Sequence, residues 1–412
     1  MKSLRYRRLR AALRSSEEGS VAVLFGLASI VLVGVVALAV DFTGANAKRA
    51  KLQSAADTAA VAGATVLVKE GTSQEATEFA EEYLLSAANG FAFSQAIDAS
   101  VEAERVSVSL SSAHPSIVGS LFNGPMTVGV ESIARLGPPS GNPVCIHALH
   151  SSMSKAVNST GGTSIEAECD VFVNSSSSSS VTMTGGGTIT ANKACLHGGL
   201  CSGTVTPAPE DCGVREDPFA SMSPSTSAAC THTNYSQSSG TYSLNPGVYC
   251  GGLTLTGGPT VALNPGTYVI RDGQLKMSGG GSMTGIGVTF VFEGSASVDL
   301  SGGGTYHLVA PTSGDFKSFV FFQRPSASPN EIAKMNGGGS TFFEGVIYLP
   351  TWETVITGGG SVATPSPFSA YIAKNFRAVG GSTISVVYDP ERITVPVPSR
   401  LFLEPRTIYL SN

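Results

Sequence analysis

The most apolar stretch of the chain runs from Ser20 to Val40 (SVAVLFGLASIVLVGVVALAV), with no charged residue between Glu18 and Asp41. As a helix it reaches roughly 30 Å, which matches the hydrocarbon thickness of a bilayer and predicts a transmembrane helix over 20–40. Residues 1–19 form a basic tail expected in the cytoplasm, because more basic residues precede the span than follow it. Those before it are Lys2, Arg5, Arg7, Arg8, Arg10 and Arg14, and those just after it are Lys48, Arg49 and Lys51.

Two processing events would change this prediction. Signal peptidase accepts small-x-small sites such as Ala37-Leu38-Ala39, but the apolar region of a signal peptide has only about 7–15 residues, so an anchor is favoured. Prepilin-type cleavage after Gly19 normally goes with a Glu shortly beyond it, where this chain has Leu24. We therefore expect the helix to stay attached to the rest of the chain.

Beyond the span, small and apolar residues recur every three or four positions and predict that the helix continues as an amphipathic stalk. Its small-residue face would let another helix approach closely, and we predict association through Leu52, Ala55, Ala59 and Ala62. A capping box, Thr72-x-x-Glu75, predicts a second helix, and alternating segments at 105–110 and 127–133 predict paired strands. These elements predict a small α+β membrane-proximal domain over 41–136, followed by the Gly- and Pro-rich linker 137–143.

From residue 144 to residue 412 the chain repeats one phrase, in which two or three glycines stand between small polar residues. Copies begin at Gly257, Gly279, Gly302, Gly337, Gly358 and Gly380, with steps near 22 residues and one longer step. Short β-branched and aromatic segments such as 289–292 and 346–349 lie between them. A period of this length predicts an all-β parallel β-helix, a solenoid of stacked strands. Residues 202–243 break the pattern and are predicted to form a Cys-rich insertion.

Composition narrows the classes of partner. Only 13% of the residues are charged, and the net charge is −5. No basic block occurs outside the N-terminal tail, so nucleic acid is excluded as a partner. The seven cysteines lie on the side predicted to be exported, where disulfides form. Seven is odd, so one thiol stays unpaired or pairs with another chain. The disulfide candidates are Cys145, Cys169, Cys195, Cys201, Cys212, Cys230 and Cys250.

One set of side chains contains the residue types that bind metals. It comprises His147-x-x-His150 beside Cys145, and Cys195-x-His197 with Cys201. In an exported protein an oxidised cysteine pair and solvent-facing imidazoles fit this pattern better than a metal site. We expect no metal site and no cofactor.

A second set contains four carboxylates within one loop, which is the chemistry that a β-helix polysaccharide lyase would need. These are Glu210, Asp211, Glu216 and Asp217. Nothing in the sequence pairs them with surroundings that would raise a pKa, so a solvated surface is the favoured interpretation. The glycine runs do not precede helices and are not phosphate loops. No catalytic residue is predicted.

The N-terminal region resembles a known family. Gly19-Ser20 before a single apolar span, Val40-Asp41-Phe42 at its end, and the run LQSAADTAAVAGA over 52–64 are similar to the N-terminal domain of TadG-like proteins of the Flp (tight adherence) pilus-assembly machinery. The similarity covers about 16–68 and extends more loosely to Leu136. Many TadG-like proteins also have a von Willebrand factor A-type domain with Asp-x-Ser-x-Ser, and this chain departs from that plan.

This resemblance implies a non-enzymatic pilus-assembly component, anchored by one span in a bacterial inner membrane and bound to other pilus-assembly proteins. The β-helix would have a structural or interaction role in the periplasm or at the surface. Its hydroxyl-rich surface would also fit a cell-surface adhesin that binds glycan or cell wall. A polysaccharide lyase is the third class, and it requires that the purified protein cleave a polysaccharide.

Overall fold

The fold is known from a computed structural model. It describes residues 17–69, 71–87, 92–101, 103–117, 124–138, 140–226, 229–337, 340–357, 366–381, 383–404 and 406–411. Most of the predicted basic tail, and parts of the glycine phrases that begin at Gly337 and Gly358, lie outside these residues.

The chain forms two compact units. We call Met1–Pro139 together with Arg406–Asn412 the membrane-proximal unit, and Ser140–Pro405 the body. The sequence places 406–412 in the C-terminal β domain, but these residues belong to the membrane-proximal unit. The reason is that their strand pairs with that unit's sheet.

One long helix, α2 (Glu17–Val68), includes both the predicted span and the predicted stalk. Its apolar side chains from Val21 to Val40 are mostly exposed, and the helix is long and apolar enough to cross a membrane. A second helix, α3 (Ser73–Ala87), begins at the predicted capping box. Thr72 N donates to Glu75 Oε2 over 2.8 Å, and Glu75 N donates to Thr72 Oγ1 over 3.1 Å. The first of these bonds lowers the pKa of the Glu75 carboxyl.

An antiparallel sheet of order β1-β2-β3-β27 packs against the second part of α2. The strands are β1 (Ser94–Ser100), β2 (Arg105–His114), β3 (Met126–Leu136) and β27 (Ile408–Ser411). Leu410 pairs with Ala134, so the last strand of the chain completes a sheet that begins before residue 100. Gly137 N donates to Thr407 O over 2.8 Å, and Arg406 pairs with Glu104. The chain therefore leaves this unit and returns to it at the same place.

The body is largely β, with one short 3₁₀ helix, η1 (Ser399–Leu401). Its strands are β4 (Val144–Ala148), β5 (Val157–Thr160), β6 (Ser164–Ala167), β7 (Asp170–Val173), β8 (Val181–Met183), β9 (Thr188–Thr190), β10 (Lys193–Leu196), β11 (Leu200–Ser202), β12 (Thr204–Thr206), β13 (His232–Ser238), β14 (Thr241–Leu244), β15 (Gly247–Thr256), β16 (Thr260–Leu263), β17 (Gly266–Met277), β18 (Ser282–Ile286), β19 (Val288–Gly294), β20 (Ser297–Leu300), β21 (Thr305–Val309), β22 (Phe319–Ala327), β23 (Ile332–Gly337), β24 (Thr341–Thr357), β25 (Ser369–Val379) and β26 (Thr383–Val386).

The strands of the body pair in parallel between successive repeats. Leu255 pairs with Met277 and Thr267 with Thr289. Glycines at equivalent points let the backbones approach closely: a Cβ on Gly258, where φ is +72°, would lie 2.8 Å from Gly279 O. The longer step after Gly302 falls where Phe290 of β19 pairs with Phe321 of β22.

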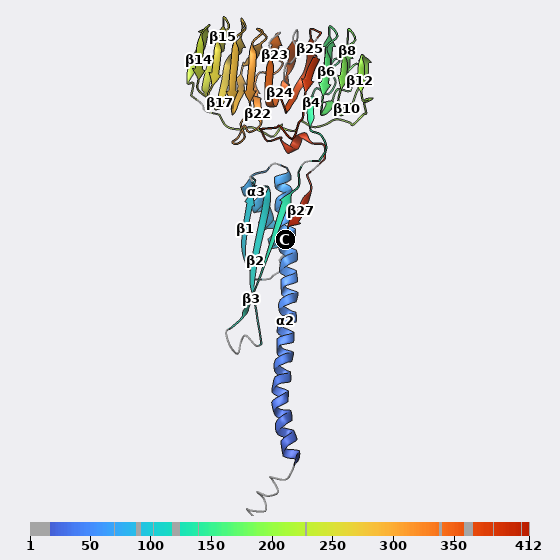
Figure 1. The fold of residues 1–412 in the computed structure, drawn as a ribbon, viewed down its shortest axis with the longest axis vertical. Helices are drawn as coiled ribbons and strands as arrows, with labels where there is room; N and C mark the ends of the chain where they lie inside the picture. Colours follow the sequence, from blue (N-terminus) through green and yellow to red (C-terminus); the bar gives the residue numbers. More distant parts are fainter. Residues whose placement is uncertain are drawn as a thin grey trace, which may run out of the picture. The chain divides into compact units, whose positions relative to one another are not determined.

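The chain order differs from the spatial order in the body. We call β4–β12 the first half and β13–β25 the second half. Pairing runs from β4 through β7 to β10 in the first half, whereas the second half starts at β13 and returns through β15, β17, β19, β22 and β24 to β25. Figure 1 shows β14 and β15 at one end of the body and β10 and β12 at the other.

The two halves join in the middle of the body, where Tyr371 of β25 pairs with Ile146 of β4. The predicted Cys-rich insertion at 202–243 covers the connection between the two halves. Residues 207–231, which we call the strap, connect one end of the body to the other, while most of 202–206 and 232–243 lies in β11 to β14. The strap lacks the glycine phrase because it runs across the strands of the body and does not add a strand pair to them.

Candidate functional site

The predicted association face of α2 is occupied within its own unit. Leu52, Ala59 and Ala62 are each no more than 7% exposed, and Ala55 packs against the same core. Gly63 belongs to this contact, since a Cβ there would lie 2.9 Å from Ala76 O of α3. These residues hold α2 against α3 and the sheet, and their association with a partner helix stays a prediction.

An open groove lies beside this buried face. It has a volume of about 500 Å³ and is bounded by the second part of α2, α3 and β27. Phe79 and Tyr83 of α3 are 37% and 44% exposed there, with ring centroids 5.2 Å apart, and Leu410 is 42% exposed. On the α2 side, Gln53 Nε2 donates to Asp57 Oδ1 over 2.8 Å. The lining residues are Asp57, Thr58, Val61, Ala62, Thr65, Phe79, Tyr83 and Leu410.

Six of the seven cysteines form disulfides in the body. The pairs are Cys145–Cys169, Cys195–Cys212 and Cys230–Cys250. Cys201 is free and exposed. The sequence left the pairing open, and the disulfide from Cys195 reaches Cys212 of the strap. Since Cys145 and Cys195 are both bonded, neither sulfur is available as a thiolate ligand for a metal.

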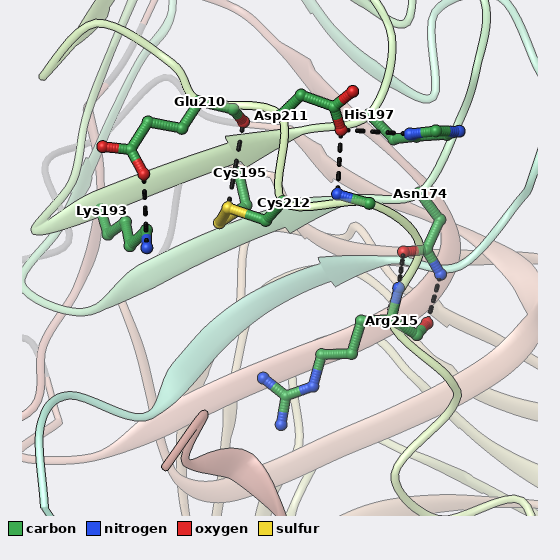
Figure 2. Close-up of a disulfide and its surroundings, with 9 residues drawn as sticks. Asn174, Lys193, Cys195, His197, Glu210, Asp211, Cys212 and Arg215 are labelled. Carbon is green, nitrogen blue, oxygen red and sulfur yellow. Dashed lines mark hydrogen bonds and ion pairs between the residues drawn. A yellow bond between two sulfur atoms is a disulfide. The ribbon is translucent and has the colours of Figure 1, made fainter.

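The beginning of the strap caps the edge of β10 (Figure 2). Leu196 N donates to Glu210 O over 2.8 Å, and Glu210 N donates to Ala194 O over 2.9 Å, so the strap adds one bridge to the edge strand. Lys193 Nζ lies 3.4 Å from Glu210 Oε2, and His197 Nδ1 lies 3.2 Å from Asp211 Oδ1. Two of the four predicted solvated carboxylates thus have cationic or imidazole partners, although both stay exposed.

Arg215 fastens the next part of the strap. Its backbone exchanges two hydrogen bonds with the Asn174 side chain: Arg215 N donates to Oδ1 over 2.9 Å, and Asn174 Nδ2 donates to Arg215 O over 2.7 Å (Figure 2). The guanidinium donates to Arg400 O over 2.5 Å and lies 5.9 Å from the centre of the Phe172 ring. In return, Arg400 Nη1 donates to Pro218 O over 3.3 Å.

Asp217 is not a solvated acid. Burial raises the pKa of its carboxyl, which accepts hydrogen bonds from Phe219 N at 2.9 Å and from the Tyr348 hydroxyl at 2.8 Å. Phe219 is 1% exposed and meets Phe319 and Tyr348 edge to face. The carboxylate therefore positions an aromatic anchor of the strap, and its loop is part of the packing.

A buried polar cluster lies beneath Arg215. His147 is 1% exposed, and both ring nitrogens lack a hydrogen-bond partner among the described atoms. Burial, reinforced by the Arg215 charge, lowers the pKa of His147 to about 3, so the predicted solvent-facing imidazole is instead a neutral core residue. Burial raises the pKa of Asp170 to about 6 and lowers that of Arg215 to about 10. Within the described residues, no three His, Cys, Asp or Glu side chains converge as metal ligands.

The far part of the strap reaches a second buried charge. Glu293 is 5% exposed and accepts hydrogen bonds from Arg271 at 2.7 Å, from Arg324 at 2.6 Å and from Thr226 of the strap. Burial alone would raise the pKa of Glu293, but these hydrogen bonds outweigh it and the pKa falls. Within its described residues the strap is thus held by two disulfides, Cys195–Cys212 and Cys230–Cys250, by one aromatic anchor and by two buried charged groups.

A groove of about 370 Å³ lies between the strap and the segment that precedes β22. Gly247, Gly266 and Gly287 form part of its floor at equivalent points of successive repeats. Its walls come from Ser225 and Thr226 on one side and from 311–316 on the other. No local pattern in the sequence marks this groove, because its walls are far apart along the chain.

Comparison with known proteins concerns the N-terminal region. No curated protein and no solved structure matches the chain significantly. Residues 19–66, which form most of α2, match the family model of Flp pilus-assembly TadE/G-like proteins. The predicted TadG-like resemblance is confirmed over these residues, and the chain carries a TadE/G-like Flp pilus-assembly domain at 19–66.

Proposed function

We propose that the chain is a non-enzymatic, membrane-anchored component of Flp/Tad pilus assembly. Helix α2 would cross the inner membrane with its N-terminus in the cytoplasm, and the body would be exported to the periplasm or the surface. One observation carries this proposal: the family-matched residues 19–66 form a single helix whose first part exposes apolar side chains and whose second part is the core of a folded unit. That combination suits a protein that holds a folded domain at a membrane surface.

The body would serve as a rigid parallel β-helix. Parallel pairing at a repeating offset, with large aromatic side chains buried between successive strands, supports this architecture. Such a solenoid resists bending because each repeat is hydrogen-bonded to the next along its length. The body would thus space or present a surface away from the membrane.

Binding to other pilus-assembly proteins would use the groove beside α2 in place of the buried face. The groove combines small side chains on α2 with exposed rings on α3, which fits an apolar helix of a partner. Thr58→Arg places a long charged side chain in the groove from an exposed position. Ser54→Arg, at an exposed position one turn away and outside the lining, is the matched control. We expect Thr58→Arg alone to abolish crosslinking to pilus-assembly proteins, and equal crosslinking by both variants would contradict this site.

The test of the overall function is a pilus count by electron microscopy in a deletion strain. Because Gly137 and Thr407 are hydrogen-bonded, the body can be replaced by a short Gly-Ser linker that keeps 406–412 and β27. Loss of pili that the full chain restores is the expected result, and normal pili in the deletion strain would overturn the proposal. Rescue by the body-less chain would assign assembly to the membrane-proximal unit, whereas rescue only by the full chain would require the body.

A surface adhesin is the second candidate, favoured by the groove between the strap and 311–316. Its glycine floor and hydroxyl walls would suit an extended glycan or cell-wall strand. An adhesin must be reachable from outside, and exposed Cys201 provides the test. Labelling of intact cells by a membrane-impermeant maleimide, absent from a Cys201→Ser strain, would support it. Labelling only after the outer membrane is permeabilised would contradict it.

A further inference from the structure

Asp41 marks a boundary along α2. It is the first charged residue after the apolar run, and it is 4% exposed, whereas Val36 and Val40 just before it are 61% and 56% exposed. Side chains before Asp41 thus face outward, and the helix begins to pack against its own unit at this point. If α2 spans a bilayer, the plane of the lipid headgroups passes near Asp41.

The Asp41 carboxylate binds the end of strand β2. Oδ2 accepts a hydrogen bond from Ser116 Oγ at 2.6 Å, and Oδ1 accepts one from Ile117 N at 2.8 Å. Nearby, Lys48 Nζ donates to Ala113 O. Gly44 allows the close approach, because a Cβ there would lie 2.8 Å from the His114 ring. These contacts fix the β2–β3 hairpin at the level where the apolar part of α2 ends.

The described ends of this hairpin connection are apolar and exposed. Ile117 is 54% exposed and Met126 is 47% exposed. The sequence contains no Asp, Glu, Lys or Arg between His114 and Glu131. By contrast, the exposed positions farther along the two strands are polar, such as Glu131. Among the described residues of β2, β3 and their connection, the exposed large apolar side chains thus lie near the boundary that Asp41 defines.

We propose that Ile117 and Met126 insert into the interfacial layer of the same bilayer that α2 crosses. The occupant of this surface is lipid, because the surface is continuous with the exposed apolar part of α2, and the hairpin connection itself contains no Asp, Glu, Lys or Arg that would favour an acidic or basic partner. A second membrane contact beside the helix prevents the membrane-proximal unit from rotating freely about α2. The proposal rests on α2 spanning the membrane, and its test separates the two claims.

The test uses the full chain with Cys201→Ser in phosphatidylcholine nanodiscs. A bimane label is attached at Ile117→Cys, and quenching by spin-labelled lipids is measured. Leu32→Cys, in the middle of the span, reports whether α2 is in the bilayer, and Glu131→Cys reports a water-exposed position on the same hairpin. We expect lipid quenching at positions 32 and 117 and little at 131. Quenching at 32 with equal, low quenching at 117 and 131 would overturn the hairpin contact alone, and no quenching at 32 would overturn both claims.

A variant pair checks that the contact is apolar. Met126→Asp should reduce quenching of the label at 117 several-fold, because a charged side chain resists the interface. Met126→Leu keeps the apolar surface and should leave quenching unchanged. Raising the ionic strength should have no effect, because the contact contains no charge. Loss of quenching in high salt, or equal effects of the two variants, would contradict the proposal.

Discussion

In the second half of the body, rings on successive strands contact one another in a row that we call the aromatic stack: Tyr249, Tyr268, Phe290 and Phe321 have neighbouring centroids 6.0, 5.3 and 5.9 Å apart. The first pair is stacked, the second tilted and the third edge to face. The core of the first half is largely aliphatic, with residues such as Val171, Ile165 and Met183, and two disulfides start from its strands or their flanking residues. Its strands are also shorter. Both halves keep parallel pairing, so the pairing does not depend on one kind of core.

The difference shows how two strand stacks of unequal apolar content can join into one body. A buried aromatic pair contributes about 0.5–1.5 kcal/mol beyond its area, whereas short aliphatic strands bury less surface each. Cross-links compensate in the first half by restricting its unfolded chain. The two halves should therefore respond to different perturbations, and four experiments test this from the largest expected effect to the smallest.

Removing a ring from the aromatic stack should have the largest effect. Phe290 is fully buried, so Phe290→Ala should lower the free energy of unfolding by about 3–5 kcal/mol. Trp352, the only tryptophan in the chain and itself fully buried, reports unfolding of the body by fluorescence in urea. Phe342→Ala removes a partly buried ring that stacks on His307 outside the core and should cost much less. Equal losses would show that the stack adds nothing beyond ordinary contacts.

Removing the disulfide at the joint should weaken the first half selectively. Cys145→Ser combined with Cys169→Ser should cost about 2–5 kcal/mol. Hydrogen exchange should show lost protection in β4 to β8, while β15 to β22 keep theirs. A uniform loss of protection across both halves would mean that the body unfolds as one unit and that the two halves do not differ in stability.

Asp170→Asn should change the pH dependence of stability. The raised pKa of Asp170 means that its protonation stabilises the folded body at low pH, and this contribution is lost as pH rises from about 4 to 6. His147 acts in the opposite sense, since its lowered pKa makes the folded body lose stability as pH falls below 6.5 toward 3.

The two residues oppose each other between pH 4 and 6, and Asp170→Asn removes one of them. Relative to the unmodified chain, the variant should lose stability as pH falls from 6 to 4, by about 1.4 kcal/mol for each unit of pKa shift removed. Urea unfolding at both pH values measures this difference. Asp315→Asn, on an exposed loop, serves as the control. A constant difference between Asp170→Asn and the unmodified chain would exclude this role of Asp170.

Cys201→Ser should have the smallest effect. The thiol is exposed and unpaired, so the free energy of unfolding should change by less than about 0.5 kcal/mol. A larger loss in non-reducing urea titrations would mean that Cys201 exchanges with one of the three disulfides.

Local patterns predicted part of this molecule. The apolar span, the Thr72–Glu75 capping box and strands β2 and β3 follow from signals within a few residues. Strand β1 gave no alternating signal, because only Ala99 of its seven residues is buried. Strand β27 has four residues and pairs across the whole intervening body, so no local pattern marks its partner.

The sites were harder to predict than the elements. Small residues on α2 indicate close helix packing, but the pattern does not distinguish an internal partner from an external one, and here the partners are α3 and the sheet. The Cys195–Cys212 pairing and the partners of Arg215 depend on the path of the strap. That path follows from the joining of β25 to β4, which spacing alone does not show.

The return of the chain to the membrane-proximal unit has a consequence for biogenesis. Strand β3 is synthesised before the whole body, and its pairing partner β27 only after it. Strand β2 covers one edge of β3, but throughout the synthesis of residues 137–407 the other edge has no strand beside it. Such an open edge is a template for wrong pairing. The closing of this sheet is therefore a late event that requires the intervening chain to have been made, which ties the maturation of the membrane-proximal unit to completion of the body.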